Sequence, residues 1–151
     1  MNKRGFTLIE LIVVIAIIGT LTALIVNNLN DVRARARDSK RKQELSGLKT
    51  ALRLYYNDYQ AYPAAPAGND DILGCGATGT SACGGSGSGF STTASDYMKQ
   101  LPEFYYYSQD SNGEGFTVKL TLENASDPDL TTSQSLCGGS YDPTDYVICA
   151  D

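Results

Sequence analysis

Apolar residues are concentrated at the N-terminal end of the chain. Of the 21 residues from Phe6 to Val26, 16 are Ala, Val, Ile, Leu or Phe. About 20 largely apolar residues are enough for a helix to cross a bilayer. Since this segment is apolar on every side, we expect it to lie in lipid or in the core of an assembly rather than in water.

A second hydrophobic pattern follows the apolar segment. Between positions 45 and 59, large apolar and aromatic residues recur at steps of three and four, the spacing of one covered face of a helix. No proline occurs before Pro63. The chain therefore predicts one helix of roughly 80 Å, from Phe6 to about Tyr59, with an apolar half (6–26) and an amphipathic half (27–60). The covered face would consist of Leu45, Leu48, Leu52, Tyr55 and Tyr59, extended upstream by Leu29, Val32 and Ala36.

The remaining residues, 61–151, predict a small β-rich head. Alternating apolar residues from Phe116 to Leu122 indicate a strand with one buried face, and an aromatic run from 104 to 108 precedes it. A β-hairpin is therefore expected over 104–122, with Tyr146–Cys149 as a third strand. The Gly/Ser-rich stretch 64–93 and the tail 127–145 predict loops. The expected fold class is α+β, with one long helix packed on a small antiparallel sheet.

Charge is divided between the two parts. Residues 27–58 carry eight basic and four acidic side chains, whereas residues 59–151 have a net charge of −10. Such an acidic head disfavours nucleic-acid binding because phosphates would be repelled. The basic segment 33–42 contains six Arg or Lys. It is explained by a solvated helix face, by contact with acidic heads of neighbouring subunits, or by contact with anionic lipid near the end of the apolar segment.

All four cysteines lie in the head, and the chain has no histidine. An even number of cysteines behind a membrane-targeting segment suggests disulfides in an oxidising compartment. Of the three possible pairings we favour Cys75–Cys83 and Cys137–Cys149, because each closes a short loop. Free thiols and a metal site are the weaker alternatives, since zinc-type Cys-x-x-Cys spacing is absent.

The N-terminus combines a basic leader with an acid inside the apolar segment. Lys3 and Arg4 are expected to remain on the cytoplasmic side of the membrane, which places the head outside. Glu10 would cost roughly 2.5–3.5 kcal/mol at mid-membrane on insertion scales. An ordinary secretory signal would be shorter and have a small-residue cleavage site. A plain membrane anchor gives no reason for Glu10, although an acid at the interface could reach water.

The order Lys3-Arg4-Gly5-Phe6-Thr7-Leu8-Ile9-Glu10 followed by an unbroken apolar run closely resembles the class III signal of type IV pilins and pseudopilins. The resemblance implies the pilin fold and a cleaved leader of residues 1–5. It also implies that a prepilin peptidase cuts between Gly5 and Phe6 and N-methylates Phe6. Many members of the family have proline at the position of Asn27, where the helix bends or melts. The partners implied are an inner-membrane assembly platform and further copies of the chain.

Cleavage would give Phe6 a positive amine. By the resemblance, Glu10 occupies the family's carboxylate position, four residues after the new N-terminus. In a filament core of low dielectric, each of these charges would be unfavourable alone. Pairing Glu10 with the Phe6 amine of a neighbouring subunit would offset much of that penalty and fix the axial register. Glu10 and Phe6 are therefore the expected assembly residues.

The end of the helix and the tail also resemble this family. The segment ending in Tyr62-Pro63 resembles the helix end of major pseudopilins and many pilins, and Cys137–Cys149 resembles the C-terminal disulfide region (137–149) of many pilins. Pseudopilins often bind calcium in a C-terminal loop, but neither acidic group here has the spacing of an EF-hand loop. Turn formation explains most of these acids. The candidate ligands are Asp127, Asp129, Asp142 and Asp145, or Asp110, Asn112 and Glu114 in the hairpin.

Neither a nucleophile–base pattern nor a legible pair of carboxylates points to an enzyme, and no cofactor is expected. The leading hypothesis is the major structural subunit of a type IV pilus. The alternatives are the major pseudopilin of a type II secretion system, a minor tip pilin acting as an adhesin or DNA receptor, and a membrane-anchored binding protein that does not polymerise. The chain would be stored in the inner membrane and then enter an extracellular pilus or a periplasmic pseudopilus.

Overall fold

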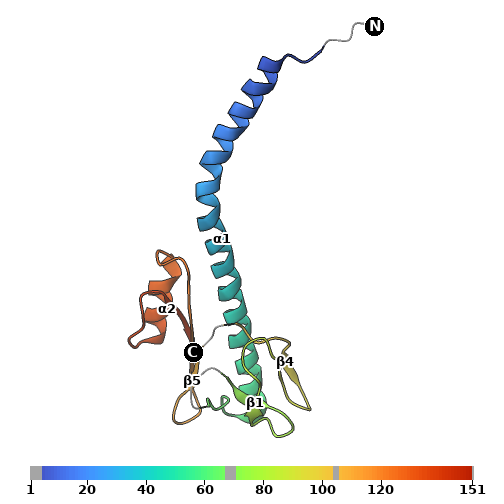
Figure 1. The fold of residues 1–151 in the computed structure, drawn as a ribbon. Helices are drawn as coiled ribbons and strands as arrows, with labels where there is room; N and C mark the ends of the chain where they lie inside the picture. The colour runs from blue at the N-terminus through green and yellow to red at the C-terminus, as the bar shows by residue number, and fades with distance from the viewer. Residues whose placement is uncertain (1–4, 67–70, 104–105, 151) are drawn as a thin grey trace.

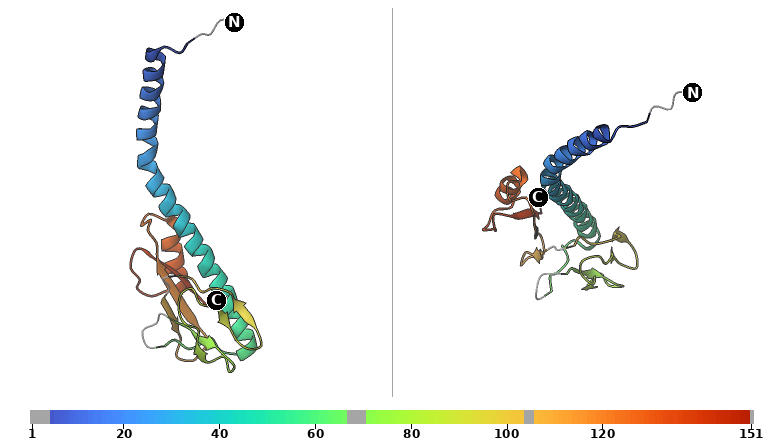
Figure 2. Two further views of the ribbon diagram at one scale, coloured as in Figure 1. Left: turned by 45° about the vertical axis from the view of Figure 1, so that its right-hand side comes forward. Right: turned by 45° about the horizontal axis from the view of Figure 1, so that its top comes forward.

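The computed structural model describes residues 5–66, 71–103 and 106–150, and within α1 the side chains of Leu24 and 26–28 are not described. A single long helix, α1 (Leu8–Tyr59), runs the length of the molecule, and the head packs around its second half (Figure 1). Its 52 residues correspond to about 78 Å. The helix continues through Asn27 and Asn28 and bends between its two halves (Figure 2).

Local sequence determines both ends of α1. Thr7 has extended backbone angles and caps the N-terminus, so the helix begins at Leu8 rather than at the predicted Phe6. Gln60 adopts the left-handed conformation that commonly ends a helix, and its N–H donates to the carbonyl of Tyr56. The residue before Pro63 is disfavoured in helical geometry. The helix therefore ends close to the predicted position.

The main sheet has three antiparallel strands, β5 (Tyr106–Gln109), β6 (Phe116–Thr121) and β7 (Asp145–Cys149), in the order β5-β6-β7. Tyr107 pairs with Val118, and Leu120 pairs with Tyr146. The β5–β6 turn contains Gly113 at φ +75°, a conformation that favours glycine. The hairpin and third strand predicted from alternation are confirmed, although residues 104–105 of the predicted hairpin lie outside the described residues.

The core lies between α1 and the head. Leu45, Leu48 and Leu52 of α1 are fully buried, and Val118 and Tyr107 of the sheet are buried with them. Tyr55 continues this face and donates a hydrogen bond to the carbonyl of Gly79 (2.6 Å). The predicted upstream extension was wrong: Leu29, Val32 and Ala36 are exposed, because they lie on the face of α1 opposite to the one that the head covers.

The stretch predicted as a loop over 64–93 is more structured than expected. It contains β1 (Leu73–Cys75), which pairs with β2 (Ser81–Ala82), and β3 (Phe90–Ser91), which pairs with β4 (Asp96–Met98) just beyond the stretch. Ile72 and Phe90 from this region are fully buried. Gly/Ser-rich composition concealed these short strands, because isolated apolar residues anchor them instead of an alternating run. The views in Figure 2 place these strands beside the C-terminal end of α1.

The tail 127–145 was also predicted to be a loop and instead contains α2 (Pro128–Cys137). Asp127 caps this helix by accepting from the N–H of Asp129, and proline occupies the first turn, where its missing N–H is tolerated. Leu130 and Ser133 of α2 are buried against β7. The signal was present as an Asp-Pro helix start, but the polar Thr/Ser sequence that follows has no strong apolar period.

Candidate assembly interface

Glu10 folds back onto the start of α1. Its Oε2 atom accepts hydrogen bonds from the N–H of Thr7 (2.9 Å) and from the Thr7 hydroxyl (2.7 Å), and the Thr7 hydroxyl oxygen in turn accepts from the N–H of Glu10 (3.4 Å). This reciprocal arrangement is a capping box, which satisfies donors left unpaired at a helix N-terminus. The carboxylate also lies where the helix dipole favours negative charge. Its position one turn from Phe6 is therefore fixed by the chain itself.

The residues predicted to be processed lie just before this cap. Phe6 is 77% exposed, and Gly5 has no other residue within 4 Å of the position that a Cβ atom would occupy. The backbone around the Gly5–Phe6 bond is thus open to approach. Residues 1–4 of the predicted leader lie outside the described residues.

The first half of α1 exposes apolar side chains on all sides. From Leu8 to Leu21 the exposed fractions of its large apolar residues lie between 46% and 75%. Soluble monomers rarely expose a continuous apolar surface of this extent. The surface comprises Phe6, Leu8, Ile9, Leu11, Ile12, Val13, Val14, Ile15, Ile17, Ile18, Leu21 and Ile25.

Within the part of the chain that the structure describes, no helical stretch is both long enough and apolar enough to cross a membrane.

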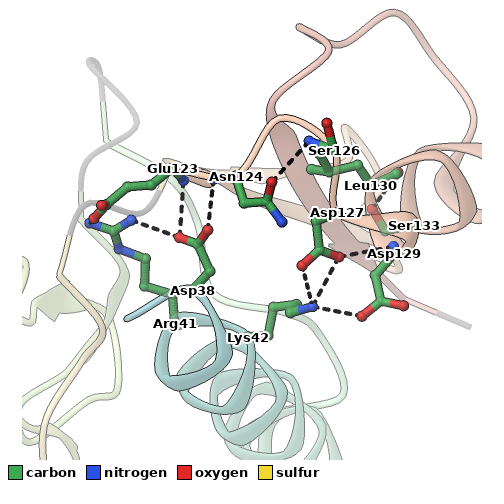
Figure 3. Close-up of polar contacts among 10 residues, drawn as sticks. All are labelled: Asp38, Arg41, Lys42, Glu123, Asn124, Ser126, Asp127, Asp129, Leu130 and Ser133. Atoms are coloured by element: carbon green, nitrogen blue, oxygen red, sulfur yellow. Dashed lines mark hydrogen bonds and ion pairs between the residues drawn. The ribbon is translucent and has the colours of Figure 1, made fainter. Parts of the chain in front are cut away.

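Asp38 fastens the head to the helix (Figure 3). Its side chain is 1% exposed and accepts hydrogen bonds from the backbone N–H groups of Glu123 (3.0 Å) and Asn124 (2.8 Å). Arg41 donates to the same carboxylate at 3.0 Å. These contacts join α1 to the segment between β6 and α2. The sequence interpretation missed this role, although Asp38 precedes Leu45 and Leu52 at seven-residue intervals and so shares their buried face.

Three of the six basic residues in segment 33–42 bind acids that lie in the head. Arg37 forms a two-pronged ion pair with Glu123, which Arg41 also contacts (3.0 Å). Lys42 donates to Asp127 (2.9 Å) and Asp129 (2.7 Å) at the start of α2. Figure 3 shows that the Asp38 and Lys42 clusters lie side by side along α1. Much of the positive charge in this segment therefore holds the head in place.

Four of the six acids considered for calcium, Asp127, Asp129, Asp145 and Glu114, have side-chain partners within the chain. Asp127 and Asp129 contact Lys42, while Asp145 accepts from Lys119 (2.8 Å). The main-chain carbonyl of Asp142 accepts from Gln134. In the hairpin turn, Asn112 donates to Glu114 (3.0 Å). Among residues 5–66, 71–103 and 106–150, no group of three or more acidic, histidine or cysteine side chains is placed to hold a metal ion.

The cysteines form two pairs, Cys75–Cys83 and Cys137–Cys149, which are the pairs favoured from the sequence. The first closes the β1–β2 turn. The second joins the end of α2 to the end of β7. Ser133 strengthens the same contact, because its hydroxyl oxygen accepts from the N–H of Val147 (3.3 Å). Disulfide and hydrogen bond together hold α2 against the edge of the sheet.

The ion pairs between helix and head predict a loss of stability in acid. Hydrogen bonding and attraction from Arg37 lower the pKa of Glu123 from 4.5 to about 2. Burial alone would raise the pKa of Asp127, but hydrogen bonds from Lys42 and the N–H of Asp129 lower it. A carboxylate whose pKa is depressed by folding stabilises the fold above its unfolded pKa, and this contribution is lost as pH falls through the folded pKa.

We therefore expect the stability of the full chain to fall between pH 4.5 and 2, and Glu123→Gln to flatten this dependence. Urea unfolding midpoints of both chains, measured in detergent across that range, test the prediction. Glu114→Gln, at an exposed residue of the hairpin turn, is the matched control and should keep the wild-type slope. Equal slopes for wild type and Glu123→Gln would contradict the assigned role of Glu123.

Comparison with known proteins agrees with this geometry. Residues 1–26 match the family described as the prokaryotic N-terminal methylation motif. The chain is 38% identical over 72 residues to the type II secretion system core protein G of Escherichia coli, a match covering 48% of this chain and 50% of the relative. It is 42% identical over 61 residues to the type IV major pilin protein PilA of Myxococcus xanthus, covering 40% of this chain and 28% of that protein. The N-terminal part of the chain is therefore similar to proteins of the pilin and pseudopilin family.

A third relative is the fimbrial protein EcpC of Eikenella corrodens, 44% identical over 62 residues, which cover 41% of this chain and 40% of that protein. The chain spans about half the length, or less, of these relatives. No solved structure matches it. The long N-terminal helix packed on small antiparallel sheets is consistent with an α+β pilin fold. The matched motif includes Phe6 and Glu10, which lie at the N-terminal end of that helix.

Proposed function

We propose that this chain is the main structural subunit of a type IV pilus. The observation that carries the proposal is the apolar surface of α1, which lies within the matched N-terminal methylation motif and is exposed on every side. Such a surface needs lipid or further copies of the same helix around it. One chain uses both in turn, with lipid before assembly and neighbouring helices afterwards. The role is structural rather than catalytic.

The processing step follows from the open N-terminal geometry. The leader 1–5 is removed by a prepilin peptidase between Gly5 and Phe6, and the new amine of Phe6 is methylated. Before cleavage, Glu10 has only the Thr7 groups as described hydrogen-bond partners. After cleavage it has a cation to pair with on the neighbouring subunit. The segment 6–26 anchors the subunit in the inner membrane until an assembly platform transfers it to the growing filament.

The structure of the head supports a pilus subunit. Two disulfides tie its loops, and Cys137–Cys149 fixes α2 against the edge strand of the sheet. Such cross-links suit a protein displayed in an oxidising, extracellular setting. A filament surface built from these heads would present α2 and the loops of 64–93.

A second candidate is the major pseudopilin of a type II secretion system, which forms a periplasmic pseudopilus. Several relatives carry the name type II secretion system core protein G, including those of Aeromonas hydrophila (38% identical over 76 residues) and Klebsiella pneumoniae (41% over 67 residues). The Tyr62-Pro63 helix end supports the same role. A minor tip pilin serving as an adhesin or DNA receptor would be present at low copy number.

Electron microscopy and mass spectrometry of filaments sheared from the cell surface test the proposal. We expect abundant filaments whose principal subunit begins at N-methylated Phe6. A secretion defect without surface filaments would favour the pseudopilin assignment over the pilin assignment. A low ratio of this chain to another filament subunit would indicate a tip protein. An uncleaved chain that remains in the membrane fraction would contradict all three assignments.

A further inference from the structure

The outward face of α1 just beyond the apolar segment has a distinct pattern. Leu29, Val32 and Ala36 are exposed and follow one another at steps of three and four, so they form an outer strip along the helix. At 100° per residue, Arg33 lies roughly 70° to one side of this strip and Arg35 roughly 90° to the other. Farther along α1 the head covers the opposite face, where Leu45, Leu48 and Leu52 are buried. The stem of an arginine can lie along such an apolar strip while its charged end reaches a lipid headgroup or water.

Arg33 and Arg35 differ from the other basic residues of segment 33–42. Arg37, Arg41 and Lys42 bind acids of the head, and Lys40 pairs with Glu44 one turn away. By contrast, Arg33 and Arg35 are exposed and form no ion pair with any residue in the described ranges. Arg35 acts on Asp127 only through its charge. These two arginines are therefore available to a partner outside the subunit.

Their height along the helix identifies that partner. At 1.5 Å per residue, Arg33 lies about 10 Å beyond Val26, where the apolar segment ends. Headgroups extend about 5–8 Å beyond the hydrocarbon on each side of a bilayer. Side chains in a helix point toward its N-terminus, and a long arginine reaches back several Å while its stem lies along apolar surface. With the apolar segment in the bilayer, both guanidinium groups reach the lipid phosphates.

The nearby acids do not oppose this contact. Asp31 lies on the far side of α1 from Arg33, and although it lies one turn before Arg35, these two described side chains form no ion pair with each other. The head itself, with a net charge of −10 over residues 59–151, would be repelled by an anionic membrane surface. Two arginines between the head and the bilayer offset that repulsion. Phosphate is also the group that a guanidinium binds best, through two parallel hydrogen bonds.

We propose that Arg33 and Arg35, together with the outer strip of Leu29, Val32 and Ala36, form a binding site for anionic phospholipid headgroups. The headgroups belong to the outer leaflet of the inner membrane, in which the subunit is stored. The site rests on the proposed function, because it requires the apolar segment to be stored in a membrane. It holds the stored subunit at a fixed depth and keeps the acidic head off the membrane surface. Extraction into a filament then exchanges the bound lipid for neighbouring subunits.

Reconstitution of the full chain into vesicles of phosphatidylcholine and phosphatidylglycerol tests the site. Electron paramagnetic resonance of spin-labelled lipids gives the relative association of each lipid with the protein boundary. We expect the wild-type chain to prefer phosphatidylglycerol, and Arg33→Gln/Arg35→Gln to lose up to about five-fold of this preference per arginine. High salt should reduce the wild-type preference in the same direction.

Lys40→Gln/Lys99→Gln is the matched control, since it removes two exposed positive charges farther along the chain. It should retain the lipid preference. Equal losses of lipid preference in the two double variants would show that the preference depends only on net charge, and would overturn the site. So would an Arg33→Gln/Arg35→Gln chain that keeps its lipid preference but forms fewer filaments, because the arginines would then contact another copy.

Carbonate extraction separates failure of this site from failure of the proposed function. A wild-type chain that does not insert into the vesicles overturns the proposed storage in a membrane. A wild-type chain that inserts without preferring phosphatidylglycerol overturns only the lipid site.

Discussion

Replacing Glu10 with glutamine is expected to abolish filaments while the chain still enters the membrane and loses its leader. Glutamine can accept the hydrogen bond from Thr7 that completes the capping box, so the start of α1 keeps its geometry. Only the negative charge is removed. The Phe6 ammonium of a neighbour would then be buried without a partner in a medium of low dielectric. Because the loss recurs at every subunit, we expect filament yield to fall on the order of 100-fold or more.

Thr7→Ala is the matched variant, because it removes the capping hydroxyl and keeps the Glu10 carboxylate. Loss of an N-cap costs about 1 kcal/mol of helix stability, so filaments should persist at reduced yield. Electron microscopy of sheared material gives the yield, and mass spectrometry of the membrane fraction gives the N-terminus. Normal filaments in Glu10→Gln would show that the negative charge of Glu10 is not required. Loss of filaments only in Thr7→Ala would show that the helix cap is required instead.

Replacing Asp38 with alanine is expected to destabilise the head by about 3–5 kcal/mol. The change leaves the N–H groups of Glu123 and Asn124 without their buried acceptor, and Arg41 loses one of its two acids. For a domain of this size such a loss lowers the unfolding temperature by more than about 10 °C. Near-ultraviolet circular dichroism of the tyrosines, recorded on the full chain in detergent, measures the transition.

Two further variants make the role of Asp38 testable. Asp38→Asn keeps one carbonyl oxygen as an acceptor and should lose less stability than Asp38→Ala. Asp31→Ala removes an exposed acid one heptad earlier on the same helix and should change stability by less than about 0.5 kcal/mol. Equal effects of Asp31→Ala and Asp38→Ala would mean that helix charge, rather than the buried hydrogen bonds, stabilises the head.

The sequence was sufficient where a single periodic signal dominated. The apolar segment and the Leu/Tyr stripe predicted α1 to within two residues at its start, and Phe116, Val118 and Leu120 predicted the central strand. It failed where apolar residues are sparse. Ile72 and Phe90 each reach the core singly from a Gly/Ser-rich stretch, and α2 is held by Leu130 and polar contacts. Neither pattern repeats often enough to distinguish a short element from a loop.

The sequence by itself determined the long helix and its apolar first half, because both depend on neighbouring positions along one helix. The processing site and the pairing of Phe6 with Glu10 remain predictions from the same local sequence. Only the tertiary structure decided the partners of the basic segment. Arg37, Arg41 and Lys42 contact acids about 85 residues later in the chain, and no local rule predicts such pairs. Burial of Asp38 likewise depends on where the β6–α2 segment crosses the helix. The difference lies in sequence separation. Helical periodicity can be recognised from neighbouring residues, whereas the ion pairs between helix and head join residues far apart in the sequence and form only once the chain has folded.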